Sequence, residues 1–186
     1  MTWVLAMVLA SEPVELSAAE TKQAVESFKV RGAWIHPAIV QEFLPWSSDH
    51  ERPIVRSMDV GAALETNRYF EDVKQGPKGA KVERGEEGSV DYEWLGRTQS
   101  GLHVLVIRLS TGGSGHFVSL GAFKLAEGQS VDGSGKPYRS LMLSIVRWQM
   151  LGDRVVPNLS IKGNVVSGPV ECLLPSCQRG EVKVSL

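Results

Sequence analysis

The Gly-rich stretch LSTGGSGHFV, residues 109–118, is the first place where the sequence offers groups for catalysis or phosphate binding. A phosphate-binding loop needs a following helix and a Gly-Lys-Ser/Thr end, but no lysine follows until Lys124. A nucleophile turn of the form G-x-S-x-G needs glycine where His116 stands. Apolar runs flank the glycines, which tolerate the positive φ angles of a tight turn. We therefore predict the tip of a β-hairpin here.

The histidines are the next candidates for chemistry. His36, His50, His103 and His116 form none of the spacings typical of a metal site, and nothing in the chain indicates a cofactor. Ser, Asp and His lie together only in WSSDH, residues 46–50, where neighbouring side chains diverge too much for a catalytic triad. A hydrolase would have to assemble its site from distant loops that carry His36, His50 or His103, and this remains an alternative.

Two polar clusters are better candidates for binding a ligand or a partner. In SMDVGAALETNRYF, residues 57–70, Asp59 ends a predicted strand and the next segment begins with Asn67, Arg68 and Tyr69. Arginine and tyrosine together can bind a carboxylate, a phosphate or a peptide group. The alternative is a structural ion pair between Asp59 and Arg68 that holds the loop against the strand. Arg97 and Thr98, in LGRTQSG, have a similar character.

Cys172 and Cys177 are the only cysteines, and the sequence between them contains Pro175. An even number of cysteines at a tight, turn-forming spacing favours one local disulfide. Two reduced structural thiols are the alternative, since redox pairs are usually spaced more closely and a zinc site would need further ligands.

The first residues, MTWVLAMVLASEP, contain an apolar run from Trp3 to Ala10 followed by polar residues. This pattern is typical of the end of a secretory signal peptide, although no lysine or arginine precedes the run. A buried first strand or helix is the alternative. Together with the cysteine pair, the leader predicts a periplasmic or secreted protein in which residues 1–12 are a signal-peptide remnant.

The composition indicates one folded domain, which we place at residues 13–186. The chain of 186 residues has 42% hydrophobic and 22% charged residues, as in ordinary globular proteins. Its net charge of −1 lacks the basic excess of a nucleic-acid-binding protein, so we expect no nucleic-acid partner. No apolar run reaches the roughly 20 residues of a transmembrane helix. The expected partner is an unidentified small molecule or protein.

The predicted elements describe a mainly β fold, with α+β as a possibility. Ser17 and Glu20 form a capping box that begins a helix, Arg31-Gly32 turns a small hairpin, and Pro37 begins a second helix. A strand is expected at RYFEDVK, residues 68–74, and a mobile loop at 74–87. Turn signals then separate many strands, and the strand at 102–109 is apolar on both faces. This pattern predicts an antiparallel meander forming a sandwich or barrel, with one or two short N-terminal helices.

The leading interpretation is an exported binding or interaction domain without catalytic activity. A hydrolase with a site assembled from distant loops is one alternative. The other is a structural component of a cell-envelope assembly that uses a sheet edge or the N-terminal helix as its contact.

Overall fold

The computed structural model of the chain describes residues 16–44, 55–65, 69, 71–173 and 180–186. Within these residues, seven antiparallel strands form a curled half-barrel in the order β3-β9-β8-β7-β6-β5-β4. Their bounds are β3 (Ser57–Asp59), β4 (Val73–Gln75), β5 (Gly79–Glu83), β6 (Ser89–Arg97), β7 (His103–Ser110), β8 (His116–Val131) and β9 (Pro137–Asp153). Strands β4 to β9 follow one another in sequence, which confirms the predicted antiparallel meander.

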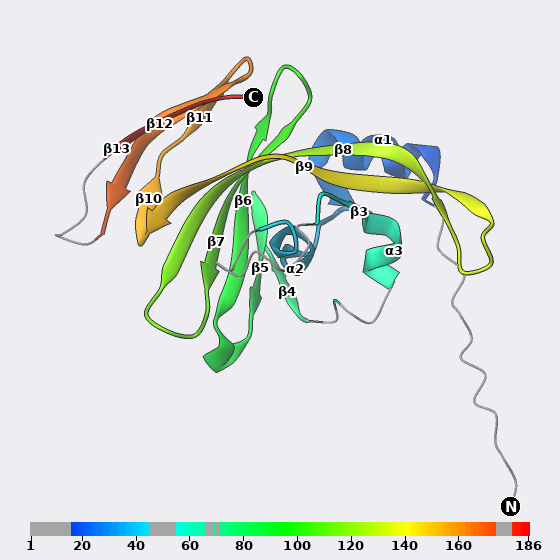
Figure 1. Cartoon of the computed structure of the whole chain (residues 1–186), viewed down its shortest axis with the longest axis horizontal. Helices are drawn as coiled ribbons and strands as arrows, with labels where there is room; N and C mark the ends of the chain where they lie inside the picture. Colours follow the sequence, from blue (N-terminus) through cyan, green and yellow to red (C-terminus); the bar gives the residue numbers. More distant parts are fainter. Residues whose placement is uncertain (1–15, 45–54, 66–68, 70, 174–179) are drawn as a thin grey trace, which may run out of the picture.

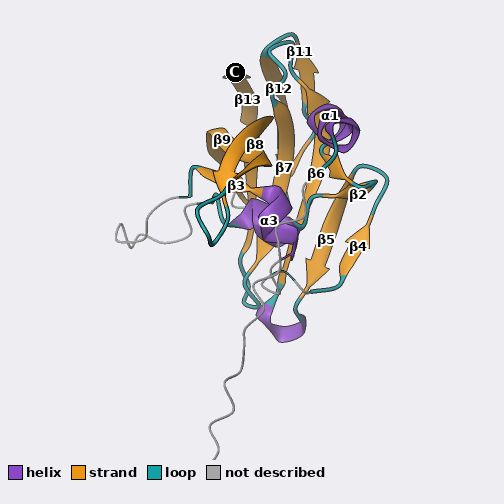
Figure 2. Cartoon of the chain, turned by 90° about the vertical axis from the view of Figure 1, so that its right-hand side faces the viewer, coloured by secondary structure: helices purple, strands orange, loops and turns teal. Residues whose placement is uncertain are grey.

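A second antiparallel sheet contains β10 (Val155–Pro157), β11 (Ser160–Lys162), β12 (Val165–Cys172) and β13 (Gly180–Ser185). The helices are α1 (Ala18–Ser27), α2 (Pro37–Gln41), α3 (Val60–Glu65) and the short 3₁₀ helix η1 (Gly85–Glu87), and β1 (Lys29–Val30) pairs with β2 (Ala33–Trp34). Figure 1 shows the second sheet on one side of the half-barrel and α1, α2 and α3 on the other. In the view of Figure 2 the helices α1 and α3 lie in front of the seven strands.

Strand β7 explains this layered arrangement. Leu105 and Ile107 belong to a large apolar core that includes Phe28, the C-cap residue of α1, and Ile39 of α2. The residues between them face the other way: Val104 and Val106 pack in a separate core with valines of the second sheet. Both faces of β7 are therefore buried, as the apolar pattern of residues 102–109 predicts.

The local signals near the N-terminus are confirmed. Ser17 caps α1 and Glu20 completes the capping box, while Arg31 and Gly32 form the turn between β1 and β2 with positive φ angles. Pro37 is the first residue of α2. Among the described residues, no helix is long and apolar enough to cross a membrane.

The segment 74–87 is not the loop that we expected, and the strand predicted at 68–74 begins only at Val73. Strand β5 pairs with β6 along its whole length, and it buries Ala80 and Val82 while Lys81 stays partly exposed. The short apolar alternation is hidden in the sequence by the surrounding charges and glycines. Its pairing with β6 supplies the stability that local propensity does not predict.

The Gly-rich stretch forms the predicted hairpin tip between Ser110 and His116. Gly112 has a φ angle of 77°, and a Cβ atom there would lie 1.9 Å from the carbonyl oxygen of Glu86. The glycine is thus required by the turn and by close packing against η1. In the next hairpin, β8 continues to Val131, and β9 begins at Pro137.

Candidate functional site

The first predicted binding cluster has a structural role where the structure describes it. Asp59 accepts hydrogen bonds from the backbone N–H of Ala62 (3.2 Å) at the start of α3 and from the hydroxyl of Tyr138 (2.7 Å). The Tyr69 ring packs beside His36, and its hydroxyl donates to Glu42 at 3.4 Å. Asn67 and Arg68 lie outside the described residues, so the predicted clamp and the Asp59–Arg68 pair stay predictions.

The second cluster lies four strand positions away from the first across the main sheet. Thr98 is buried and organises the β6–β7 turn, since its Oγ1 accepts from the N–H of Leu102 (3.0 Å). Arg97, the last residue of β6, is exposed and lies opposite His103 in the strand register. Only Arg97 of the described candidates thus extends an exposed charged group, and the structure does not join the two clusters into one site.

His103 is fully buried between α1 and the sheet. Its Nδ1 accepts a hydrogen bond from the indole N–H of Trp94 (3.2 Å), so the proton of the neutral ring is on Nε2, which donates to the Val25 carbonyl (3.0 Å). Burial lowers the pKa of His103 to about 4, and the nearby Arg97 cation acts in the same direction. His103 therefore fixes the end of α1 against β6 and β7.

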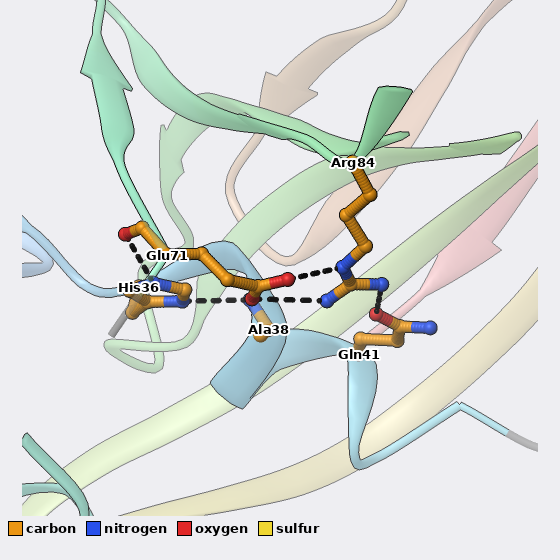
Figure 3. Close-up of polar contacts among 5 residues, drawn as sticks. All are labelled: His36, Ala38, Gln41, Glu71 and Arg84. Carbon is orange, nitrogen blue, oxygen red and sulfur yellow. Dashed lines mark hydrogen bonds and ion pairs between the residues drawn. The ribbon is translucent and has the colours of Figure 1, made fainter. Parts of the chain in front are cut away.

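His36 belongs to a second internal network, shown in Figure 3. Its Nδ1 accepts from the N–H of Ala38 at 3.1 Å and thereby caps α2, while Nε2 lies 3.3 Å from the backbone oxygen of Glu71. Burial lowers the pKa of His36. Both ring nitrogens thus contact backbone groups. His50, the third histidine of the hydrolase alternative, lies outside the described residues.

The carboxylate of Glu71 completes this network. Arg84 binds both oxygens of Glu71 through Nε and Nη2, and its Nη1 donates to the side-chain oxygen of Gln41 (3.0 Å). The hydrogen bonds from Arg84 hold the pKa of Glu71 below its usual value. The side chains of Arg84 and Glu71 are only 23% and 26% exposed. We call His36, Gln41, Glu71 and Arg84 the Arg84 cluster, in which every charged group has a partner.

A groove with a different character lies on the other side of α1. It has a volume of about 410 Å³ and runs between α1, the β6–β7 turn and β8. Lys22, Arg97 and Lys124 line it from these three elements, and all three side chains belong to exposed residues. None of them forms an ion pair with another described residue. The acidic residue of the lining, Glu127, is already bound by Arg139 (2.7 Å).

The groove exists because β8 is longer than β7. The β7–β8 ladder ends where His103 meets Phe123, but β8 continues to Val131 with β9 as its strand neighbour. The β6–β7 turn bends away toward the second sheet, where the N–H of Gln99 donates to the Gly163 carbonyl (2.9 Å). Helix α1 lies alongside the uncovered part of β8, with Thr21 and Val25 facing the groove.

Comparisons of the chain with protein-family models, with curated proteins and with solved structures find no match. The described residues contain no group of histidine, cysteine and carboxylate side chains suited to a metal ion. Among the described residues that line the groove there is no histidine or cysteine. The charged side chains that line the groove are Lys22, Arg97, Lys124 and Glu127.

Sequence reasoning identified Arg97 but not Lys22 or Lys124. Neither lysine belongs to a motif, and they are 102 positions apart along the chain. The capping box that begins α1 and the turn signals on either side of β7 are the signals that bear on their positions. Those signals do not say which face of the sheet the helix covers or where β7 stops relative to β8.

Proposed function

We propose that this protein is a binding domain whose ligand site is the groove between α1, the β6–β7 turn and β8, and that the ligand is anionic. The observation that carries this proposal is that Lys22, Arg97 and Lys124 all line one groove and form no ion pair with another described residue. Other cations, such as Arg84 and Arg108, are bound to carboxylates of the fold. Cations that line the same groove favour an arriving anion.

A titration with sodium acetate, followed by the backbone amide signals in NMR spectra at constant ionic strength, tests this proposal. We expect saturable shifts at Lys22, Ser100, Gly101 and Lys124, and their loss in the double variant Lys22→Glu/Lys124→Glu. The matched control is Lys78→Glu/Lys183→Glu, which makes the same charge change at two exposed lysines outside the groove. Shifts that are absent, or equal in the two double variants, would contradict the proposal.

Export of the protein is a second part of the proposal. The apolar run at Trp3–Ala10 and the cysteine pair support it. Cys172 is the last residue of β12, whereas Cys177 lies outside the described residues, so the disulfide stays a prediction. Intact-mass spectrometry of the protein from its own host tests both features, with loss of the leader and two hydrogens fewer than the reduced chain as the expected result. A full-length, reduced chain would contradict export.

A further inference from the structure

Strand β8 has an uncovered edge that begins inside the groove. From Lys124 to Val131 it pairs with β9, and no strand of the described chain lies on its other side. Along such an edge, alternate residues direct their backbone N–H and C=O groups away from the sheet. These groups lie in line with β7, at the place that residues before His103 would take if β7 were longer.

Helix α1 faces this edge across the groove. Ala18, Thr21 and Val25 lie on the helix side, and Leu125 and Ala126 lie on the strand side. Thr21 and Leu125 are the buried residues of this lining, and they contribute one hydroxyl and one aliphatic side chain. No aromatic side chain is found among the described lining residues. The space therefore suits an extended chain with an aliphatic side chain better than a flat ring.

The charges define the two ends of the groove. His103 begins β7, binds the Val25 carbonyl and lies opposite Arg97, so Val25 and Arg97 are at the end where β7 starts. Lys124 follows the last β8 residue that pairs with β7. Glu127, three residues farther along β8, lines the groove beyond Lys124. A ligand with one terminal anion would thus place it at the Arg97 end.

We propose that the ligand is the C-terminal segment of a protein or peptide, which adds to β8 as an antiparallel strand and brings its terminal carboxylate to Arg97 and Lys124. This inference rests on the function proposed above and specifies its ligand. A strand that continues β7 runs antiparallel to β8, so its C-terminus points toward His103 and Arg97. The peptide backbone supplies hydrogen-bond partners for the β8 edge, which an alkyl chain cannot do.

A library of random heptapeptides with free C-termini tests the inference, with the full-length protein as the bait. Enriched peptides are then synthesised with a C-terminal carboxylate and with a C-terminal amide, and their affinities are measured by fluorescence anisotropy. We expect the amide to bind about tenfold more weakly or worse, because a charge-assisted hydrogen bond is lost. Hydrogen exchange of the backbone amides at 124–131 is expected to slow when the carboxylate peptide binds.

The double variant Arg97→Gln/Lys124→Gln is expected to lower the affinity for the carboxylate peptide by a similar factor. Its affinity for the amide peptide is expected to equal that of the wild type. Its matched control, Lys78→Gln/Lys183→Gln, is expected to stay within about twofold of the wild type. The comparison of carboxylate with amide uses the wild-type protein alone, so it holds even if a variant folds poorly.

Three results would overturn the inference. The first is that no peptide is enriched although acetate still shifts the backbone amide signals of the groove. This result would support an anion site but would reject a peptide as its ligand. The second is equal affinity of carboxylate and amide peptides. The third is protection from exchange at another strand while 124–131 remains unchanged. Loss of both the acetate shifts and peptide binding would instead contradict the proposed function itself.

Discussion

The Arg84 cluster and the groove contain similar side chains but use them in opposite ways. Arg84 is largely buried, and its guanidinium is bound by the Glu71 carboxylate and the Gln41 amide oxygen. Arg97 is exposed, and its Nε donates only a long hydrogen bond to the Gly101 carbonyl (3.5 Å). A charge that the fold neutralises holds elements together, whereas charges gathered without partners are available to a ligand. Under the proposed function, this difference separates charges that stabilise the fold from charges that bind the ligand.

The largest expected effect concerns the buried His103, which, like the Arg84 cluster, forms its hydrogen bonds within the fold. Its pKa is about 4 in the folded protein, against about 6.5 in an unfolded chain. The unfolded state therefore binds more protons between these values, and stability falls as the pH decreases from 6.5 to 4. The maximum loss is about 3 kcal/mol. The lowered pKa of His36 adds a loss of the same sign.

Urea denaturation at several pH values between 6.5 and 4 measures this effect. The variant His103→Gln is the control, because an amide can still accept from Trp94 and donate to Val25 but does not titrate in this range. We expect the fall in stability with decreasing pH to be smaller in the variant than in the wild type. Equal pH dependence in the two proteins would show that His103 is not held neutral by the fold.

The second effect comes from breaking the Arg84 cluster. The substitution Arg84→Met leaves the partly buried Glu71 carboxylate and the Gln41 amide oxygen without their donor. We expect a loss of about 2 kcal/mol in the free energy of unfolding, less than for a fully buried ion pair because both side chains keep some contact with water. The double variant Glu71→Gln/Arg84→Met is expected to recover part of this loss, since it removes the unpaired charge. If urea denaturation shows that Arg84→Met changes the free energy of unfolding by less than about 0.5 kcal/mol, Arg84 contributes no more to stability than an ordinary surface residue.

The smallest effect is expected for the same type of substitution in the groove. Lys124→Met removes a cation that forms no ion pair with a described carboxylate and that shares its groove with Lys22 and Arg97. Stability should change by less than about 0.5 kcal/mol, with a slight gain at low salt because repulsion is relieved. Urea denaturation at low and high salt checks this expectation. A loss as large as that of Arg84→Met would mean that Lys124 serves the fold, and the contrast between the two regions would fail.

The sequence predicts those parts of the fold that depend on neighbouring residues. The capping box of Ser17 and Glu20 predicts α1, and the two-sided apolar pattern of residues 102–109 predicts a central strand covered on both faces. Strand β5 is not predicted because its two buried apolar side chains, Ala80 and Val82, lie among charged residues and glycines, and because it is stabilised by pairing with β6. Nonlocal pairing of this kind leaves little local signal.

The candidate site was less predictable for a related reason. Arg97 was a candidate because it belongs to a polar segment between two predicted strands, and it is the last residue of β6. Asp59 and Thr98 were candidates for similar reasons, but their side chains form hydrogen bonds within the fold. Lys22 and Lys124 line the same groove because α1 packs beside β8 at the point where the pairing of β8 with β7 ends. A difference in the lengths of two neighbouring strands creates the groove, and no single stretch of sequence encodes that difference.

The most direct test of the groove as the ligand site follows both arginines in one experiment. The side-chain Nε–H signals of Arg84 and Arg97 are followed by NMR while sodium acetate is added at constant ionic strength. We expect a saturable shift of the Arg97 signal and an unchanged Arg84 signal, because the Arg84 guanidinium is already bound by the Glu71 carboxylate. An unchanged Arg97 signal, or equal shifts at both arginines, would contradict the claim that the groove is the ligand site.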